Sequence, residues 1–486
     1  MHRALRHFPS VRESHVKVMD ITACIPVNWV FFSQIIHVQF SIMKFPPISG
    51  CLASVVAIAA AIGGVQANNP LATPDQHALD ALATDIYKEN SFPVLKAEAK
   101  KAYKKAHGNP ISDEASSSLD EAIEELTFSA VQKAVNIDPY HPKVYWYDSG
   151  PRRWFGLDVP GGRYSYDNPD CIYRIIPISS KVDYVVTGQR YTPGPTDVSF
   201  SLISDPNSQN TVSHLSGDDL AVNSDGSYII TVNSSSADGQ NNHIKSTLRA
   251  KQLLIRNNLG DWQSEKPDNL SVKVVSDNSG HNPTSRDQIV ADAKWNLQES
   301  VADYGVGALG LKTMVNKVNT LPNASQSSTL GTLTSQASSF GHYNLTADQA
   351  IVATLTIGEA DYFVFPATNP WMVTEGPGNN QVSLNNKQAV TNANGTYTFV
   401  VSLADPGVYN WINTTGLHEG SIMVRWQGLN ISSSSSAHSV SCVTQLVQLA
   451  DLSSVLPKET RYVTPEERAA QVDKRARAYY SRLADE

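Results

Sequence analysis

Two stretches of the sequence, 223–232 (NSDGSYIITV) and 392–401 (NANGTYTFVV), carry the same pattern in different halves of the chain. Each begins with a turn signal, Asp225-Gly226 or Asn394-Gly395, and continues into a run of β-branched and aromatic residues. Asp-Gly or Asn-Gly before such a run is typical of a β-hairpin. The two stretches therefore predict strands that follow tight turns, in two copies of one β unit.

Further matches extend this repeat along the chain. At the spacing that separates these two stretches, the matched positions are Val232 with Val401, Asn241 with Asn410, and 253–256 (LLIR) with 422–425 (IMVR). Upstream, 183–186 (DYVV) resembles 361–364 (DYFV) at a wider spacing, which implies extra residues in the first copy. This order favours a duplicated β unit whose halves are related by a pseudo-twofold. The alternative is a coincidence among common hairpin turns.

The rest of the chain reads as a mainly β protein with helical additions. Short runs rich in Val, Ile, Tyr and Thr are typical of a β-sandwich or a β-barrel, and they fall into two related blocks. The predicted strands of the first block are 143–147, 171–178, 183–191, 198–203, 228–232, 248–256 and 270–275. Apolar residues at helical spacing predict helices in 73–136 and 287–318, and a capping box at Thr464 begins a charged helix.

The predicted segments follow one another without overlap. They are an upstream extension with a signal peptide from Met43 (1–67), a helical region (68–137), a first β-sandwich block (138–280), a helical insert with a connector (281–349), a second β-sandwich block (350–450) and a C-terminal charged helix (451–486).

Composition and motifs exclude several classes of protein. With 41% hydrophobic and 17% charged residues, the 486-residue chain has enough apolar material for two or three cores, which rules out a disordered or fibrous protein. A net charge of -8, with no basic run outside the last helix, argues against a nucleic-acid partner. The sequence has no Gly-x-Ser-x-Gly elbow, Walker loop or His-Glu-x-x-His motif, so it indicates no reaction, no cofactor and no metal site.

The segment 1–67 reads as a targeting segment. A positive charge follows Met43, 48–64 is apolar and rich in Ala, and Val65-Gln66-Ala67 places small residues where signal peptidase needs them. Cleavage would leave Asn68 as the first residue of a secreted protein with no stable membrane span. The alternative is a membrane anchor made of this stretch and a second, interrupted one, 21–42, although neither is a clean run of about 20 apolar residues.

Secretion would bring the chain into an oxidising compartment. Cys171 and Cys442 remain after cleavage and are one candidate disulfide. Seven Asn-x-Ser/Thr sequons would then be candidate sites of N-glycosylation on surface turns. They begin at Asn233, Asn269, Asn323, Asn344, Asn394, Asn413 and Asn430.

Five short motifs between residues 138 and 485 form an ordered set. They are Asn168-Pro169-Asp170 with Tyr173; Asp225-Gly226; Asp405-Pro406-Gly407 leading to Asn410-Trp411; Gly416 and Gly420 before Arg425-Trp426; and Leu456-Pro457 with Thr464-Pro465-Glu466-Glu467-Arg468. The set resembles the family of proteins that carry domain of unknown function 1214. The resemblance implies a β-sandwich of jelly-roll type and no settled activity. The signal peptide and the sequons depart from the family pattern and argue against an intracellular role.

Two arginines are the most informative charges, because Arg256 and Arg425 recur at equivalent positions of otherwise apolar strands. A buried strand arginine needs an acid partner or an anionic group of a ligand. The candidate partners are Asp225, Asp405 and Glu419. A structural ion pair is the alternative to a ligand anchor.

Aromatic residues in turns give a second set of candidates. Asp405, Asn410 and Trp411 lie in one turn and Trp371 in another, where aromatic rings can stack on a sugar or an apolar ring. The alternative is that these rings close the ends of the sandwiches. His418-Glu419, between two glycines, is a candidate acid–base pair.

Together these features predict a secreted glycoprotein that binds an apolar or carbohydrate-like small molecule. The alternative is a non-redox enzyme, an isomerase, cyclase or hydrolase, that acts on a lipophilic small molecule in a cavity between the two β blocks. Arg256 or Arg425 with nearby carboxylates would then do the chemistry. A closed cavity with shifted carboxylates would favour the enzyme, and an exposed row of aromatic rings would favour the binding protein.

Overall fold

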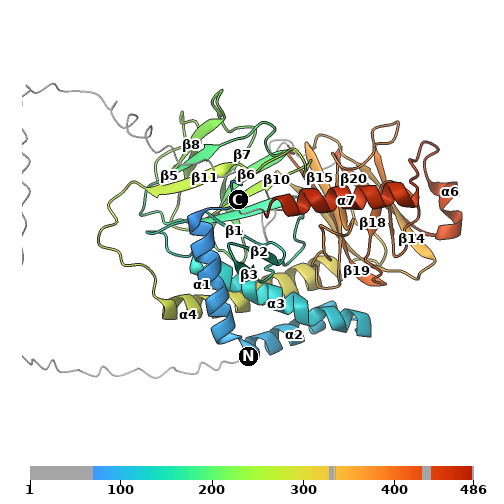
Figure 1. Ribbon diagram of the computed structural model, residues 1–486, viewed down its shortest axis with the longest axis horizontal. Helices are drawn as coiled ribbons and strands as arrows, with labels where there is room; N and C mark the ends of the chain where they lie inside the picture. The colour runs from blue at the N-terminus through green and yellow to red at the C-terminus, as the bar shows by residue number, and fades with distance from the viewer. Residues whose placement is uncertain (1–68, 328–332, 334, 430–438, 484–486) are drawn as a thin grey trace, which may run out of the picture. The chain divides into compact units, whose positions relative to one another are not determined.

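The structure is a computed structural model that describes residues 69–327, 333, 335–429 and 439–483. The expected signal peptide and the sequon at Asn430 lie outside these residues. The described chain is mainly β, with antiparallel sheets, an N-terminal helical region and a C-terminal helix, as predicted (Figure 1).

Three helices form the N-terminal region: α1 (Pro74–Asn90), α2 (Pro93–His107) and α3 (Asp113–Val135). Thr73 is the N-cap of α1, because its Oγ1 accepts a hydrogen bond from the backbone N–H of Gln76 at 3.1 Å. Asp80 anchors α1, since its buried carboxylate accepts hydrogen bonds from Arg152 at 2.8 Å and from Trp154 at 2.9 Å.

The first sandwich consists of two facing sheets. Its five-stranded sheet has the order β1-β4-β10-β6-β7 and its four-stranded sheet the order β11-β5-β8-β9. The strands are β1 (Tyr145–Tyr147), β4 (Cys171–Pro177), β5 (Tyr184–Gln189), β6 (Asp197–Ile203), β7 (Thr211–Ser216), β8 (Ser227–Asn233), β9 (His243–Lys245), β10 (Gln252–Asn258) and β11 (Asn269–Val274). A separate two-stranded sheet pairs β2 (Arg152–Trp154) with β3 (Leu157–Val159). Of these strands, β2, β3, β7 and β9 were not predicted.

The second sandwich repeats this arrangement. Its sheets have the orders β12-β13-β19-β15-β16 and β20-β14-β17-β18, which match the first sandwich strand for strand. The strands are β12 (Ser325–Gln326), β13 (Ala337–Asn344), β14 (Gln349–Thr356), β15 (Tyr362–Thr368), β16 (Ser383–Asn385), β17 (Tyr397–Ser402), β18 (Trp411–Asn413), β19 (Glu419–Gln427) and β20 (Ser441–Gln448). The pairs β8–β9 and β17–β18 are both parallel, so even this irregularity recurs. The duplication predicted from the sequence is confirmed.

The two turns that suggested the repeat are built alike. Gly226 and Gly395 have positive φ angles of 84° and 81°, which glycine adopts without steric cost. In each turn the backbone N–H of the residue after glycine donates to the side chain two residues earlier, Asp225 or Asn394.

Two details of the predicted alignment are wrong. The residue equivalent to Asn410 is Asn242 rather than Asn241, because each binds a loop backbone through both its amide atoms, at Val390 and at Ala221 respectively. The match of 183–186 with 361–364 also fails. These stretches belong to β5 and β15, which lie in different kinds of sheet, and the strand equivalent to β5 is β14.

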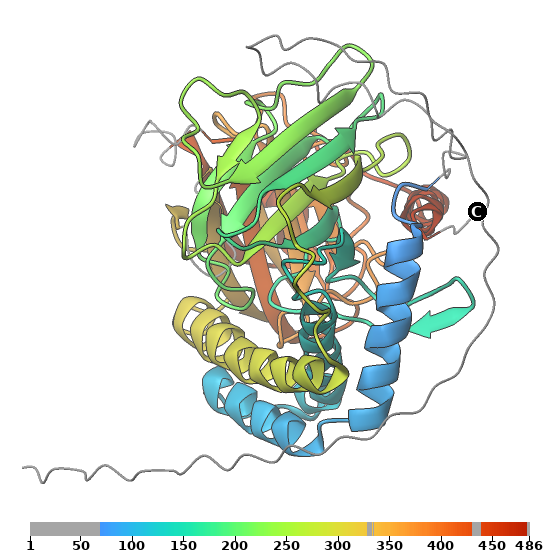
Figure 2. The same ribbon diagram turned by 90° about the vertical axis from the view of Figure 1, so that its left-hand side faces the viewer.

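A helical insert lies between the two sandwiches in the sequence. It comprises α4 (Arg286–Ser300) and the π-helix η1 (Val301–Thr313), and it packs beside α2 and α3 (Figure 2). Gly305 allows this packing, since a Cβ there would lie 2.7 Å from the ring of Tyr103. The second sandwich begins with β12 and β13, earlier than the predicted boundary at residue 350.

The C-terminal part contains the short helices η2 (Leu449–Asp451) and α6 (Leu452–Val455) and the longer helix α7 (Pro465–Ser481). The predicted capping box is present, with Thr464 and Glu467 each bonded to the other's backbone N–H. Arg475 fixes α7 to the second sandwich by donating hydrogen bonds to backbone oxygens of Pro377 and Ser383.

Side chains alternate between the two faces of the central strands. In β10, Leu253 and Ile255 point into the core of the first sandwich, while Leu254 faces the helices. In β19, Ile422, Val424 and Trp426 fill the core of the second sandwich. Arg256 and Arg425 belong to the other face of their strands, outside the sandwich cores.

Asp170 joins the two sandwiches. Its buried carboxylate accepts a hydrogen bond from Trp262 of the first sandwich at 2.8 Å. It also accepts hydrogen bonds from Tyr362 at 2.6 Å and Asn385 at 2.9 Å, both in the second sandwich. Nearby, the amide of Asn258 donates to the amide oxygen of Gln427, its counterpart in the repeat, at 2.6 Å.

The candidate disulfide is not formed. Cys171 and Cys442 are both free and buried. Cys171 begins β4 in the five-stranded sheet of the first sandwich, whereas Cys442 lies in β20, in the four-stranded sheet of the second. The two thiols belong to separate sheets of separate sandwiches, so the prediction was wrong.

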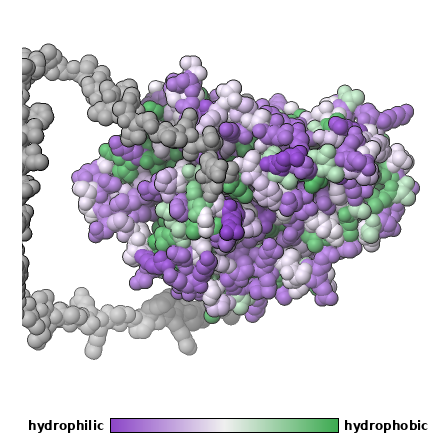
Figure 3. All heavy atoms as spheres, in the orientation of Figure 1, coloured by the Kyte–Doolittle hydropathy of each residue, from purple (hydrophilic) through white to green (hydrophobic). Residues whose placement is uncertain are grey.

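The surface is mixed in character. On the face shown in Figure 3, hydrophobic side chains form small separate patches among hydrophilic ones. A search of the described residues finds no helix with the length and apolar character needed to cross a membrane.

We expect Asp170→Asn to destabilise the protein. The new amide N–H group would face the N–H and O–H donors whose hydrogen bonds the carboxylate accepts. Each hydrogen bond to a charged group is worth roughly 1.5–3 kcal/mol, so the free energy of unfolding should fall by about 3 kcal/mol or more. Chemical denaturation followed by tryptophan fluorescence measures it. Asp225→Asn is the matched control, because it copies the turn residue Asn394 of the second sandwich and should leave the stability within about 0.5 kcal/mol. An equal, small effect of both changes would show that Asp170 does not hold the sandwiches together.

Candidate functional site

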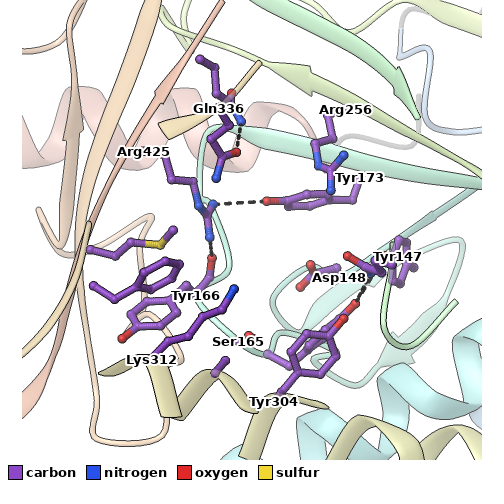
Figure 4. Close-up of a pocket in the computed structure, with 16 residues that line it drawn as sticks. Tyr147, Asp148, Ser165, Tyr166, Tyr173, Arg256, Tyr304, Lys312, Gln336 and Arg425 are labelled. Atoms are coloured by element: carbon purple, nitrogen blue, oxygen red, sulfur yellow. Dashed lines mark hydrogen bonds between the residues drawn. The ribbon is translucent and has the colours of Figure 1, made fainter. Parts of the chain in front are cut away.

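A small cavity lies between the two sandwiches, beside the π-helix η1 (Figure 4). We call it the central cavity, and its volume is about 60 Å³. Its walls come from the five-stranded sheet of each sandwich, from the loop that contains Tyr164 and from η1. The lining residues are Tyr147, Asp148, Tyr164, Ser165, Tyr166, Tyr173, Gln209, Arg256, Tyr304, Ala308, Lys312, Gln336, Phe340, Met423, Arg425 and Gln427.

Both arginines predicted from the repeat line this cavity. Arg256 comes from β10 and Arg425 from β19, at equivalent positions of the two sandwiches. Because the two strands present the same face to the same space, the repeat brings its two arginines together. They are 5% and 8% exposed, so their positive charges are removed from bulk water.

Arg425 is held by backbone and side-chain oxygens. Its guanidinium donates to the carbonyl oxygen of Tyr166 and, at 3.4 Å, to the hydroxyl of Tyr173. The guanidinium of Arg256 lies 5.9 Å from the centre of the Tyr173 ring. Tyr173 therefore separates the two cations and contacts both.

Asp148 is the acidic group of the cavity. It follows β1 directly, and its buried Oδ1 has no hydrogen-bond partner within the described part of the chain. Burial raises the pKa of Asp148 well above its usual value, and the negative charge of Asp167 adds to this effect, while Lys133 and Arg425 oppose it. Burial therefore favours the protonated form of this carboxyl group, which can donate a hydrogen bond.

Tyrosine hydroxyls line the wall nearest the helices. The side-chain amide of Gln209 donates to the hydroxyls of Tyr147 and Tyr164, at 3.1 and 3.0 Å. Behind them, Lys133 of α3 lies 4.4 Å from the centre of the Tyr164 ring. Burial lowers the pKa of Lys133 to about 8, although Asp148 and other acids oppose this.

The lining carries more positive than negative charge. Arg256, Arg425 and Lys312 are cations, and Asp148 is the one carboxyl group among the lining residues that the structure describes. Figure 4 shows these four side chains around the same space. Burial lowers the pKa of Lys312, as expected for an ammonium group withdrawn from water. Three cationic side chains against one carboxyl group give the described lining a net positive charge, whether or not Asp148 is ionised.

The backbone around the cavity is unusual. Four lining residues other than glycine, Asp148, Ser165, Tyr166 and Gln209, have positive φ angles between 47° and 65°. Backbone of this kind costs free energy and gathers at functional sites. The π-helix η1 supplies Tyr304, Ala308 and Lys312, and π-helical turns are also frequent at functional sites.

Helix η1 contains a glycine-rich motif. Residues 305–310 (GVGALG) match the Gly-x-Gly-x-x-Gly pattern of dinucleotide-binding loops. That pattern acts in a turn between a strand and a helix, where its backbone N–H groups face a pyrophosphate. Here it lies inside a π-helix, where Gly305 and Gly310 lie against Tyr103 and Ala106 of α2.

The other predicted ligand-binding residues lie away from the central cavity. Asp405 pairs with Arg468 at 2.8 Å, and Asn410 binds the loop at Val390. Trp411 is buried and donates to Ser402 O at 3.3 Å. Trp371 is 1% exposed, and its indole donates to the carbonyl oxygen of Ala115 in α3. These side chains pack the ends of the second sandwich and the helical region.

The predicted acid partners of the arginines were wrong as well. Asp225 lies in an exposed turn, and Asp405 is bound to the C-terminal helix α7. Glu419 accepts a hydrogen bond from Ser112 and does not line the central cavity. The expected pair His418-Glu419 is also separated, since His418 binds Glu114 instead.

Several residues of the cavity were missed at the sequence level. Asp148 ends the buried run 145–147 (YWY), and an acid directly after such a strand is a signal that was available. The tyrosines gave no comparable signal, because Tyr164, Tyr166 and Tyr304 lie in a loop and in a helix without local pattern. Among the described residues, no three His, Cys, Asp or Glu side chains come close enough to hold a metal ion.

We expect Asp148→Asn to change how stability depends on pH. A carboxyl whose pKa is raised on folding stabilises the fold fully below its unfolded pKa, near 3.9, and this contribution is lost as the pH rises through the folded pKa. The variant keeps the shape and cannot ionise. It should therefore gain stability relative to the wild type as the pH rises above the unfolded pKa, by up to about 1.4 kcal/mol per pH unit, until the pH reaches the folded pKa. Urea denaturation at several pH values measures this, and a variant that is less stable by the same amount at every pH would contradict it.

Comparisons with known proteins support the fold and give no information about the chemistry of the site. No family model matches the sequence, and no curated protein matches it. The structure is similar to the crystal structure of an uncharacterised protein from Burkholderia cenocepacia, with a TM-score of 0.61 and 20% identity over 76% of this chain and 99% of that chain. The VPA0106 protein of Vibrio parahaemolyticus matches with a TM-score of 0.35 and 9% identity over 76% of this chain and 100% of that chain, which is too distant to carry an argument. The first similarity supports the fold alone.

Proposed function

We propose that this protein is a secreted protein that binds a small anionic molecule in the central cavity. The observation that carries the proposal is the convergence of Arg256 and Arg425, one from each sandwich, on one small buried space. Two buried guanidinium groups favour negative charge nearby, because withdrawing a cation from water is costly. A carboxylate or another oxyanion of a ligand supplies that charge and matches the planar fork of arginine.

The polar lining supports the same ligand chemistry. Hydrogen-bond donors surround the arginines: the Lys312 ammonium, several tyrosine hydroxyls and the protonated form of Asp148, which burial favours. At about 60 Å³ the cavity takes a small head group rather than a whole large molecule. The rings of Phe340 and Tyr166, 5.4 Å apart, offer an apolar wall to the rest of the ligand. The ligand is thus more polar than the sequence suggested, with an anionic head and an aromatic-lined seat.

A non-redox enzyme is the second candidate, and one observation favours it. Burial favours the protonated form of Asp148, and the side chain lies beside cations that stabilise negative charge on oxygen. An aspartic acid in this state can protonate or polarise a carbonyl oxygen of the ligand. Trp371 and Trp411 are buried, so they do not form an exposed row of aromatic rings. Such a row would have favoured simple binding.

Secretion and glycosylation are supported by the sequence and by exposure. The signal-like segment 43–67 precedes the described residues. Asn323, Asn344 and Asn394 are exposed, and Asn233, Asn269 and Asn413 are partly exposed, so glycans have access to them. We also retain membership of the domain of unknown function 1214 family as a proposal, supported by its motifs.

We expect Arg256→Gln and Arg425→Gln to weaken anion binding. Isothermal titration calorimetry with phosphate, sulfate, acetate and oxalate tests this, with acetamide as the uncharged probe. Loss of a charged hydrogen bond should lower the affinity roughly tenfold or more, at about 1.5–3 kcal/mol each. Arg153→Gln is the matched control, because Arg153 is 81% exposed on β2 and outside the lining.

The proposal fails if the wild type binds no anion of the panel, or if all three arginine variants bind equally well. Melting temperatures of the variants separate lost binding from lost folding. Following the bound anion by NMR over hours distinguishes the two candidates, since an enzyme converts it and a binding protein leaves it unchanged.

We expect the protein isolated from its natural source to begin at Asn68 and to carry N-glycans. Signal peptidase cleaves after small residues such as Ala67, and the exposed sequons are accessible to glycosylation. Intact mass spectrometry before and after enzymatic deglycosylation measures both. A chain that retains Met1 and shows no mass shift would overturn secretion without affecting the proposal for the cavity.

A further inference from the structure

A second cavity lies where the second sandwich meets the end of α2 and the segment after η1. Its volume is about 350 Å³, which falls within the usual range of roughly 300–1,000 Å³ for small-molecule sites. The lining residues are His107, Asn109, Met314, Val318, His342, Tyr343, Asn344, Pro370, Glu419, Gly420 and Ser421. They come from the end of α2, from the segment after η1 and from β13 and β19.

The two cavities share the same strands. On β19, Glu419 and Ser421 line the second cavity, and Met423, Arg425 and Gln427 line the central one. All five positions alternate along one face of the strand. At the equivalent positions of the first sandwich, Ala250 and Gln252 stand in place of Glu419 and Ser421. The second cavity therefore belongs to one copy of the repeat.

Two buried histidines in this cavity each have one ring nitrogen that makes no hydrogen bond to the described residues. His107 and His342 are 4% and 8% exposed, and the Nδ1 atom of each lacks a hydrogen-bond partner among the described residues. A buried polar atom without a partner costs free energy and calls for an explanation, such as a ligand.

The charge of this cavity is the reverse of that of the central cavity. None of its lining residues, all of which the structure describes, is a lysine or an arginine. Burial lowers the pKa of His107, although the charge of Glu419 opposes this, and burial also lowers the pKa of His342, so both rings are neutral at pH 7. A neutral imidazole both donates and accepts hydrogen bonds. The carboxylate of Glu419, 3.9 Å from His107 Nε2, accepts only.

We propose that the second cavity binds an uncharged, polyhydroxylated ring of the size of one sugar residue. The hydroxyl groups of such a ring both donate and accept, which fits two neutral imidazoles and a carboxylate. Met314, Val318 and Pro370 line the same space and can contact the apolar C–H faces of the ring. An anion is disfavoured here, since Glu419 would repel it. The proposal does not rest on anion binding in the central cavity.

One lining residue raises the question of where the sugar comes from. Asn344 is exposed at this cavity and begins the sequon Asn344-Leu345-Thr346. The occupant is therefore either a free sugar or the first residues of a glycan attached to Asn344 itself. Both sources present the same chemistry, and Thr346→Ala separates them because it removes the sequon and keeps Asn344.

The experiment uses saturation-transfer NMR on the full chain, made in a host that does not attach N-glycans and, together with Thr346→Ala, in a host that does. The probes are N-acetylglucosamine, mannose and glucose, with acetate as the charged control. Val318→Trp fills the cavity and should abolish the sugar signals. Val315→Trp is the matched control, because Val315 is 65% exposed in the same segment and does not line the cavity.

A second pair of variants tests the imidazoles. His342→Gln should weaken sugar binding roughly three- to tenfold, as expected for one lost hydrogen bond. His214→Gln is its control, since His214 lies on β7 of the first sandwich, and burial lowers its pKa to about 4. Melting temperatures show whether each variant folds.

Each outcome decides the matter. Sugar signals in unglycosylated wild type that disappear in Val318→Trp support the proposal. If glycosylated wild type also binds, the natural occupant is a free sugar; if only the unglycosylated chain or Thr346→Ala binds, the occupant is the glycan on Asn344. Absence of sugar signals in the unglycosylated wild type, or equal binding by Val318→Trp, overturns it.

Discussion

The buried carboxylate of Asp170 is the constraint on which the arrangement of the two sandwiches depends. It accepts hydrogen bonds from Trp262 on one side and from Tyr362 and Asn385 on the other. A carboxylate removed from water is stable only while such donors surround it, so the two sandwiches are held in one relative position. In that position the outer faces of β10 and β19 enclose the central cavity. The motif Asn168-Pro169-Asp170, which carries part of the family resemblance, therefore has a structural role.

Duplication explains the arginines but not the whole cavity. Arg256 and Arg425 occupy equivalent positions, so duplication of the strand supplied the second cation without a further substitution. Asp148, the tyrosine-bearing loop and η1 lie outside the repeated strands, and they close one side of the space. A symmetric pair of cations inside an asymmetric wall can bind one end of a ligand and orient the other. The second cavity, which belongs to one sandwich, follows from the same loss of symmetry.

Much of the fold could be predicted from the sequence, because strands and turns leave local patterns. The repeat could be recognised from the turns at Gly226 and Gly395 and from the similar strand sequences 253–256 and 422–425. The start of the last helix could be predicted from Thr464. The short strands β2, β3 and β9 have three residues each, too few to show an alternation. The site was harder. Arg256 and Arg425 were found because they interrupt apolar strands, whereas Trp371 and Asp405 were misjudged because a turn residue's burial depends on distant helices.

The central cavity gathers residues from position 147 to position 427, and this has a consequence for how the protein is made. A ribosome releases the first sandwich while β15, β16 and β19 are still being synthesised. Until they emerge, Asp170 lacks two of its donors, and the outer face of β10 is uncovered. Vectorial synthesis therefore includes a long interval in which a folded first half exposes a surface meant for the second. Such intermediates are aggregation-prone, so this protein should depend on chaperones during translation more than its separate sandwiches would.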